Sequence, residues 1–215
     1  YAVERMVRGG EEKLYGEDVT VEEVMREVMK DWPHFRRSGG GLTLSGGETL
    51  LQPDFASALL FAAHREGINT AIESTGFAKF STIKNKILPY LDLFLMDIKH
   101  MDSAKHREFT TQPNDLVLEN ARKIAQTGQN LIIRVPVVPT FNATTAEIRA
   151  IAEFAASLPG VTRLHLLPYH RLGQDKYAGL NRPYLLEQIL PPSTEQMEEL
   201  KAEAEKTGLL VQIGG

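Results

Sequence analysis

The chain has 215 residues, of which 24 are Lys or Arg and 28 are Asp or Glu, so its formal charge is −4. This length suits one domain that can bury a sizeable core. The mild acidity and the lack of a basic cluster argue against nucleic-acid binding. No apolar run reaches the roughly 18 residues that a membrane-spanning helix needs. We therefore expect a cytoplasmic protein without a nucleic-acid or membrane partner.

The sequence contains no cysteine. Disulfide scaffolds, thiolate nucleophiles and zinc or iron–sulfur sites held by cysteine are therefore excluded within this chain. This exclusion becomes important for the cofactors considered below.

The N-terminal part divides into a tail and the start of a domain. Residues 1–18 are expected to be a loosely attached tail, and residues 19–215 to form a single domain. Thr20 and Glu23 form a capping box, and apolar residues follow at helical spacing, which predicts a helix to Trp32. Pro33 is expected to end that helix.

Strand and helix signals then alternate along the chain. A strand at 39–45 is followed by a helix that starts near Pro53 and stops at Gly67. Further strands are predicted at 68–73, 91–98, 131–138, 162–167 and 209–213, and further helices at 82–88, 103–109, 115–127, from Thr144, and from Ser193 to Gly208.

This alternation predicts an α/β fold in which helices pack outside a parallel sheet. The runs at 91–98 (LDLFLMDI) and 131–138 (LIIRVPVV) are almost continuously apolar, as parallel strands buried on both faces should be. Both an open doubly wound sheet and a full or partial barrel fit the pattern. In either architecture, ligands bind at the carboxyl ends of the strands.

Polar and glycine-rich segments follow five successive predicted strands. Taken singly, each has an ordinary structural explanation: a Gly-Gly pair makes a turn, Asp97 and Lys99 can form an ion pair, and a lone histidine is more often structural than a ligand. Their coincidence at one edge is what indicates a site. The candidates are Gly46, Gly47, Glu48, Glu73, Ser74, Asp97, Lys99, Arg134 and His170.

The chemistry of these residues suits an amino acid attached to a nucleoside. Gly46 and Gly47 let the backbone approach a ligand closely, and Glu48 can pair with an ammonium group. Lys99 and Arg134 can bind a carboxylate or ribose oxygens. The oxygens of Glu73, Ser74 and Asp97 are of the kind that a hard cation prefers. The residues alone do not indicate the reaction.

The run GGLTLSGGE at 40–48 resembles the glycyl-radical-enzyme activating enzymes of the radical S-adenosylmethionine (radical SAM) superfamily, whose best-known members activate pyruvate formate-lyase. The resemblance covers about residues 19–214. It continues through Glu73-Ser74-Thr75-Gly76, Met96 to Asp102, Ile133 to Val137, Phe141-Asn142 and Leu166 to His170.

The resemblance implies a partial parallel (β/α)6 TIM-like barrel and a role for each motif residue. Gly46, Gly47 and Glu48 would hold the amino group of S-adenosylmethionine, and Lys99 its carboxylate. The other candidates divide into a ribose and adenine set, Arg134 and His170, and a site for a monovalent cation beside the cofactor, Glu73, Ser74 and Asp97.

Three departures from the family pattern stand out. Thr49 replaces the usual proline, which is expected to change only the stiffness of the turn. Glu73 replaces an aspartate found in some members. The family's CxxxCxxC loop, which holds a 4Fe-4S cluster, is absent, so we expect an inactive fragment without the first strand, in which residues 1–18 are a tail or the remnant of an upstream insert. The alternative is a natural relative that has no cluster.

The implied function is activation of a partner glycyl radical enzyme, with flavodoxin or ferredoxin as electron donor. The cluster would reductively cleave S-adenosylmethionine to a 5′-deoxyadenosyl radical, which removes hydrogen from a glycine of the partner. One alternative is a module that binds S-adenosylmethionine and docks the partner without redox chemistry. A second is a metal-dependent barrel hydrolase or aldolase that uses Asp97, Lys99, His100 and His170.

Overall fold

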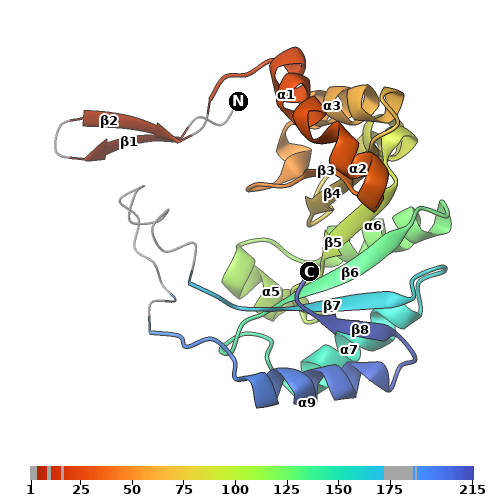
Figure 1. Cartoon of the computed structure of the whole chain (residues 1–215). Helices are drawn as coiled ribbons and strands as arrows, with labels where there is room; N and C mark the ends of the chain where they lie inside the picture. Colours follow the sequence, from red (N-terminus) through yellow and green to blue (C-terminus); the bar gives the residue numbers. More distant parts are fainter. Residues whose placement is uncertain (1–3, 9–10, 16, 172–185, 187) are drawn as a thin grey trace.

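The computed structural model describes residues 4–8, 11–15, 17–171, 186 and 188–215. Its centre is a six-stranded parallel sheet whose strands lie side by side in chain order (Figure 1). The partial parallel barrel predicted from the sequence is therefore confirmed. The strands are β3 (Gly41–Leu44), β4 (Asn69–Ser74), β5 (Leu93–Asp97), β6 (Leu131–Val137), β7 (Arg163–Pro168) and β8 (Leu210–Ile213).

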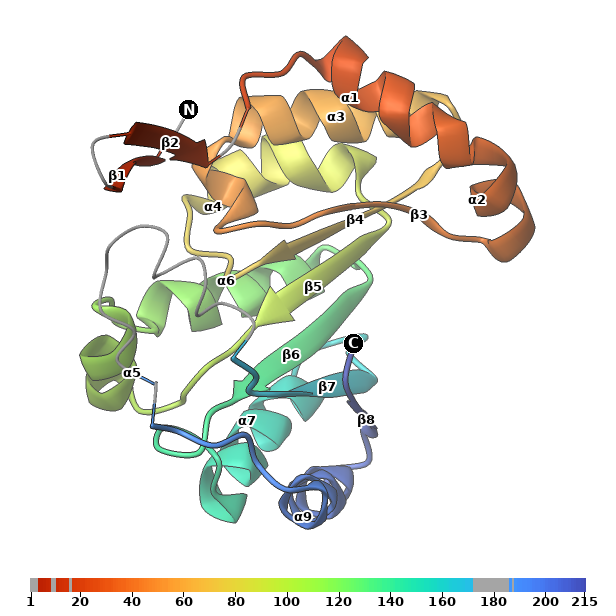
Figure 2. The same cartoon turned by 60° about the vertical axis from the view of Figure 1, so that its left-hand side comes forward.

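The helices cover one face of the curved sheet (Figure 2). Short 3-10 turns at 29–31, 49–51 and 88–90 and a π-helical segment at 83–87 connect or extend them. No helix in the described part of the chain is long and apolar enough to cross a membrane. The helices are α1 (Val21–Val28), α2 (Trp32–Ser38), α3 (Pro53–Arg65), α4 (Phe80–Thr82), α5 (Ser103–Thr110), α6 (Asp115–Gln126), α7 (Thr145–Ala156) and α9 (Thr194–Glu205).

The prediction that Pro33 ends the first helix is wrong. Helix α1 begins at the predicted capping box, where Thr20 accepts from the amide of Glu23. A 3-10 turn then leads into α2, and Pro33 lies in the first turn of α2. Proline is tolerated there because the first amides of a helix have no partner within the helix.

The segment predicted as a tail contains two short strands. β1 (Glu4–Arg8) and β2 (Glu11–Tyr15) pair with each other in antiparallel register, from Glu4 opposite Tyr15 to Arg8 opposite Glu11. They form a two-stranded sheet of their own. A domain boundary near residue 18 stays a prediction.

The register of the parallel strands decides which side chains share a face. Ile72, Phe94 and Ile133 are fully buried toward the helices. Because side chains alternate along a strand, the residues between them point to the opposite face, here called the inner face of the sheet. The register of the strands therefore decides which polar side chains become neighbours on the inner face near the strand ends.

Candidate functional site at the carboxyl edge of the sheet

The carboxyl edge of the sheet is the edge formed by the last residues of the parallel strands and the loops that follow them. Register places Asp97 opposite Arg134 and Arg134 opposite His165, so one polar row crosses β5, β6 and β7 on the inner face. Gln212 on β8 continues the row. The sheet therefore brings together residues that are far apart in the chain.

Arg134 connects two acidic strands through its guanidinium group. Its Nε and Nη2 each donate to Oδ1 of Asp97 at 3.0 Å. Nη1 donates to Oε1 of Glu73 at 2.5 Å, and the other oxygen of Glu73 accepts from Ser45 at 2.7 Å. The arginine side chain is only 11% exposed. The buried guanidinium of Arg134 thus connects the carboxyl ends of the four strands β3, β4, β5 and β6.

The charges in this network stabilise one another. Burial by itself would lower the pKa of Arg134, but the neighbouring charges of Asp97 and Glu73 outweigh it and raise that pKa. Burial would likewise raise the pKa of Glu73, but hydrogen bonds from Ser45 and Arg134 lower it below its usual value. The carboxylate and the guanidinium therefore both stay charged near neutral pH.

Glu48 holds the loop after β4. Its Oε1 accepts from Ser74 Oγ at 2.6 Å and from the amide of Leu50 at 3.0 Å. Its Oε2 accepts from the hydroxyl of Thr75 at 2.6 Å and from the Thr75 amide at 3.0 Å. These four donors match the roughly four acceptor positions of a carboxylate. Glu48 therefore acts as a structural anchor in this arrangement.

The turn around the two glycines is open on one side and fixed on the other. Apart from its two chain neighbours, no atom of the described residues lies within 4 Å of where a Cβ on Gly47 would be, so on this side its backbone is open to a ligand. Gly46 has φ of 137°, which a side chain would strain. The hydroxyl of Thr49 lies 3.0 Å from the carbonyl of Glu73 and 3.3 Å from that of Leu44, so it does more than alter turn stiffness.

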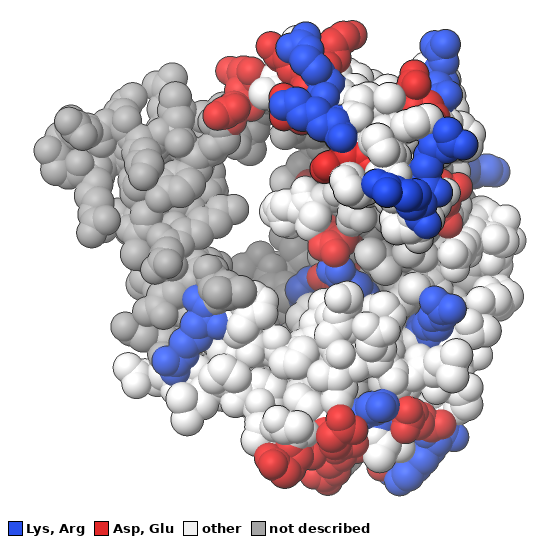
Figure 3. Space-filling view, in the orientation of Figure 1, with Lys and Arg blue, Asp and Glu red and all other residues white. Residues whose placement is uncertain are grey.

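A cavity of about 270 Å³ lies at this edge, beside Gly47 and Glu48. Asp97 and Lys99 bring opposite charges to it, and their side chains approach to 3.4 Å. Figure 3 shows acidic and basic side chains meeting near the hollow centre of this face. The rest of the lining is mixed apolar and polar: Leu51, Thr75, Phe77, His106, Thr110, Gln112 and Val117.

Most of the predicted residues meet at the carboxyl edge. Glu48, Ser74 and Thr75 form one hydrogen-bonded group, and Glu73, Asp97 and Arg134 form another. Lys99 joins the second group through Asp97. His170 follows β7, two strands along from β5, and is exposed.

The three residues predicted as cation ligands do not fit a cation in this arrangement. Glu73 and Asp97 bind the guanidinium of Arg134, which already supplies the positive charge. Ser74 donates to Glu48 and, as the neighbour of Glu73 on a strand, faces the other side of the sheet. No group of three His, Asp or Glu side chains in the described residues could hold a metal ion.

The metal-dependent hydrolase or aldolase alternative loses His100, one of its two histidines. His100 is only 2% exposed, and its Nδ1 lies 3.1 Å from Glu147 and accepts from the amide of Asp102 at 3.0 Å. Burial lowers its pKa, against the opposing effect of Glu147. The ring is therefore part of the loop structure after β5.

Sequence reasoning missed two groups of site residues. His165 lies on the inner face beside Arg134, and its buried Nδ1 has no hydrogen-bond partner among the described residues. The second group, buried asparagines, bonds the loops of the carboxyl edge from distant positions. The alternation of β7 could have placed His165 on the inner face. Of the asparagines, Asn142 lies in a motif of the family resemblance, but no local signal reveals the contacts of any of the three. The three asparagines are Asn114, Asn120 and Asn142.

Comparison with known proteins finds one family model and several relatives that match this chain. The sequence model described as the radical SAM superfamily matches residues 6–155. The (2S)-3-sulfopropanediol dehydratase activating enzyme of Klebsiella oxytoca is 41% identical over 179 residues, which are 82% of this chain and 56% of that protein. The pyruvate formate-lyase-activating enzyme of Staphylococcus epidermidis is 36% identical, covering 85% of this chain and 74% of that protein.

A solved structure matches as well. A domain of pyruvate-formate lyase-activating enzyme from Bacteroides vulgatus superposes with a TM-score of 0.68 at 33% identity, covering 82% of this chain and 99% of that one. The chain spans only 56% and 62% of the lengths of two curated relatives, the Klebsiella enzyme and a choline trimethylamine-lyase activating enzyme of Oleidesulfovibrio alaskensis.

Proposed function

Because this chain belongs to the radical SAM superfamily and, within it, to the glycyl-radical-enzyme activating enzymes, we propose that its carboxyl edge is the S-adenosylmethionine site of such an activating enzyme. The observation that carries the proposal is the cavity of about 270 Å³ that joins the Gly47-Glu48 turn to Lys99. Its mixed lining suits a small molecule with both charged and apolar parts.

The two charged groups of the amino-acid part of the ligand would bind at opposite ends of the cavity. The ammonium of Lys99 would bind the carboxylate of the ligand by a charge-assisted hydrogen bond. The open backbone of Gly46 and Gly47, with the negative charge of Glu48 behind it, would take the amino group. Because four protein donors already occupy Glu48, its contribution to the amino group is through charge rather than a new hydrogen bond.

The remaining residues orient the ligand and the strands beneath it. Arg134 keeps Asp97 and Glu73 in place, and through Asp97 it acts on Lys99. Arg134 has five N–H donors and uses three of them on these carboxylates, so two are left that could contact ribose. His170, exposed after β7, would lie on the ribose and adenine side. Ser74 supports Glu48, and the proposal includes no cation at Glu73, Ser74 and Asp97.

A 4Fe-4S cluster does not fit this chain, because its sequence offers no cysteine. In the family, the cluster and S-adenosylmethionine together supply the radical that removes hydrogen from a partner glycine. This chain alone would therefore bind S-adenosylmethionine without cleaving it, and its residues orient the ligand and exclude water.

The partner proposed for the activating enzyme is a glycyl radical enzyme, and the electron donor is flavodoxin or ferredoxin. Relatives of this chain are named for activating a sulfopropanediol dehydratase and pyruvate formate-lyase. The alternative is a module that binds S-adenosylmethionine and docks the partner without redox chemistry. A CxxxCxxC loop encoded in the same open reading frame would reject that alternative.

Titration calorimetry with S-adenosylmethionine tests the site directly. The chain should bind weakly, and Lys99→Ala should weaken binding about tenfold or more, because a charge-assisted hydrogen bond contributes about 1.5 to 3 kcal/mol. Lys84→Ala is the matched control, since Lys84 is exposed and lies outside the cavity. No binding by the unmodified chain, or equal binding by Lys99→Ala, would contradict the proposal.

A further inference from the structure

Three buried asparagines hold the loops of the carboxyl edge in the same way. Each donates to two backbone carbonyls through its Nδ2, at distances of 2.7 to 2.8 Å. None is more than 2% exposed. Asn120 bonds Gly76 and Ala78 after β4, Asn114 bonds His100 and Met101 after β5, and Asn142 bonds Lys99 and Pro136.

These hydrogen bonds satisfy backbone carbonyls that the hydrogen bonds of the sheet do not reach. Past their last paired residues the strands separate, and the carbonyls of the following loops lose their ladder partners. A buried carbonyl without a donor costs about 1 to 3 kcal/mol. A side-chain amide carries two donor hydrogens, so one asparagine can satisfy two carbonyls and fix the distance between them.

Asn142 stands where the pairing of β5 with β6 ends. The last bond between them runs from the amide of Ile98 to the carbonyl of Arg134. In a parallel ladder the next donor would be residue 136, which is a proline without an N–H. The side chain of Asn142 instead joins the carbonyls of Pro136 and Lys99, while its Oδ1 accepts from the amide of Val138 at 2.8 Å.

We propose that Asn142 is a positioning residue of the cofactor site, which fixes the backbone of Lys99 so that the lysine ammonium faces the cavity. The carbonyl held at 2.7 Å belongs to the residue whose side chain lines that cavity. This inference rests on the proposed function only for the identity of the ligand. The contact by which Asn142 fixes Lys99 does not depend on which ligand binds.

Asn114 holds the same loop one and two residues further on. It bonds the carbonyls of His100 and Met101, and Glu147 accepts from the amide of Met101 at 2.6 Å. The loop after β5 is therefore held by side chains from three different segments. Asn142 is the member of this group that bonds Lys99 itself, so its loss should affect the lysine most.

Hydrogen–deuterium exchange tests the positioning without any ligand. In Asn142→Ala, amides of residues 98–102 should exchange about tenfold faster than in the unmodified chain, because two carbonyls lose their donor. Thr70→Val is the control: Thr70 is equally buried and bonds Tyr90 and Asp92 at the other edge, so its loss should leave residues 98–102 unchanged. Unchanged exchange in the alanine variant would overturn the proposal.

Calorimetry then separates the positioning from the proposed function. Asn142→Ala should weaken S-adenosylmethionine binding about tenfold, with Thr70→Val within about twofold of the unmodified chain. If Asn142→Ala does not fold, Asn142→Ser, which keeps one hydroxyl, and Asn114→Ala, which removes the bonds to His100 and Met101 of the same loop, take its place. Absence of binding by the unmodified chain would count against the proposed function alone, and the exchange result would still decide the role of Asn142.

Discussion

The two edges of the parallel sheet both carry a cavity, and the two cavities differ in charge as well as in size. At the amino edge, where the strands begin, a cavity of about 400 Å³ lies against Gly41, Thr43, Ala71 and Leu93. The cavity at the carboxyl edge is smaller, about 270 Å³, yet it contains Lys99, Asp97 and Glu48. The larger space is therefore not the better candidate for a charged ligand.

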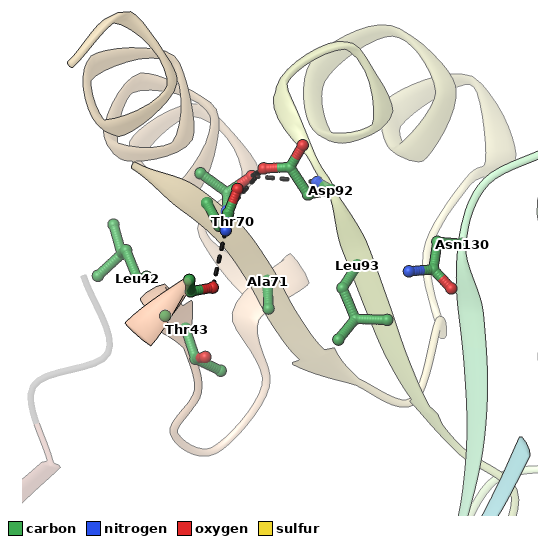
Figure 4. Close-up of a pocket in the computed structure, with 11 residues that line it drawn as sticks. Leu42, Thr43, Thr70, Ala71, Asp92, Leu93 and Asn130 are labelled. Atoms are coloured by element: carbon green, nitrogen blue, oxygen red, sulfur yellow. Dashed lines mark hydrogen bonds between the residues drawn. The ribbon is translucent and has the colours of Figure 1, made fainter. Parts of the chain in front are cut away.

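The polar groups at the amino edge bond one another and close the strand ends (Figure 4). Asp92 accepts from the amide and the hydroxyl of Thr70, at 2.8 and 3.1 Å, and its own amide donates to the Thr70 hydroxyl. Asn69 donates to the carbonyl of Gly39. Among the described residues that line this cavity, none is a lysine or arginine.

The comparison indicates that polar side chains at the amino edge serve stability, whereas those at the carboxyl edge serve both stability and ligand binding. At the amino edge, polar side chains satisfy local backbone groups. At the carboxyl edge, Arg134 and Glu48 satisfy several groups each, while Lys99 and the backbone of Gly47 stay open to the cavity. Substitutions at the two edges should therefore separate into losses of stability alone and losses of both stability and binding.

Arg134→Leu should have the largest effect. It leaves Glu73 and Asp97 close together and without their cation, so the free energy of unfolding should fall by about 3 kcal/mol in urea. The same substitution at exposed Arg163 on β7 should cost less than about 0.5 kcal/mol. Equal losses for the two arginines would show that the network adds nothing to the carboxyl edge.

Glu48→Gln should have an intermediate effect. In the unmodified chain, hydroxyl and amide donors bond the carboxylate of Glu48, and in the variant the NH2 group of glutamine would face one of these donors. The free energy of unfolding should therefore fall by about 2 kcal/mol, and the affinity for S-adenosylmethionine should fall as well. Glu66→Gln, at an exposed position, serves as control in thermal unfolding and calorimetry. Full stability together with lost affinity would mean that Glu48 binds the ligand directly instead of anchoring the loop.

The smallest predicted effect is the acid sensitivity from His165. Burial and then the charges of Arg134 and Arg163 lower its pKa below the ordinary 6.5, so the unfolded chain takes up a proton before the folded chain does. Its contribution to stability is present above pH 6.5 and is lost as the pH falls below that value.

His165→Gln should therefore lose less stability than the unmodified chain between pH 7.5 and 5.5, by less than about 1 kcal/mol. His34→Gln, at an exposed position, should follow the unmodified chain in denaturant titrations at both pH values. Identical pH dependence in all three proteins would mean that His165 takes up its proton equally in the folded and unfolded states.

The sequence was sufficient to predict the sheet because buried parallel strands read as apolar runs. All six strands lie within two residues of their predicted ranges, including β5 at Leu93–Asp97 and β6 at Leu131–Val137. The error at Pro33 has a simple cause, since proline is compatible with the end of one helix and with the first turn of the next.

The candidate site was predictable as a set of residues but less so as a set of contacts. The position of each motif at a strand end brought Glu73, Asp97 and Arg134 to one edge. The grouping of Glu73 with Ser74 as ligands ignored the alternation of a strand, which separates neighbours onto opposite faces. The asparagine contacts span 13 to 44 residues along the chain, except for that with Pro136, and nothing local marks them.

Gly76 shows how this packing limits sequence variation. Its φ is 69°, and a Cβ there would lie 2.5 Å from the terminal methyl of Met96. A shorter side chain at position 96 would free the space but leave the backbone angle unchanged. A second substitution at Met96 therefore cannot fully restore the stability that Gly76→Ala loses. In a library of variants, substitutions at the two positions should not be correlated as a compensating pair.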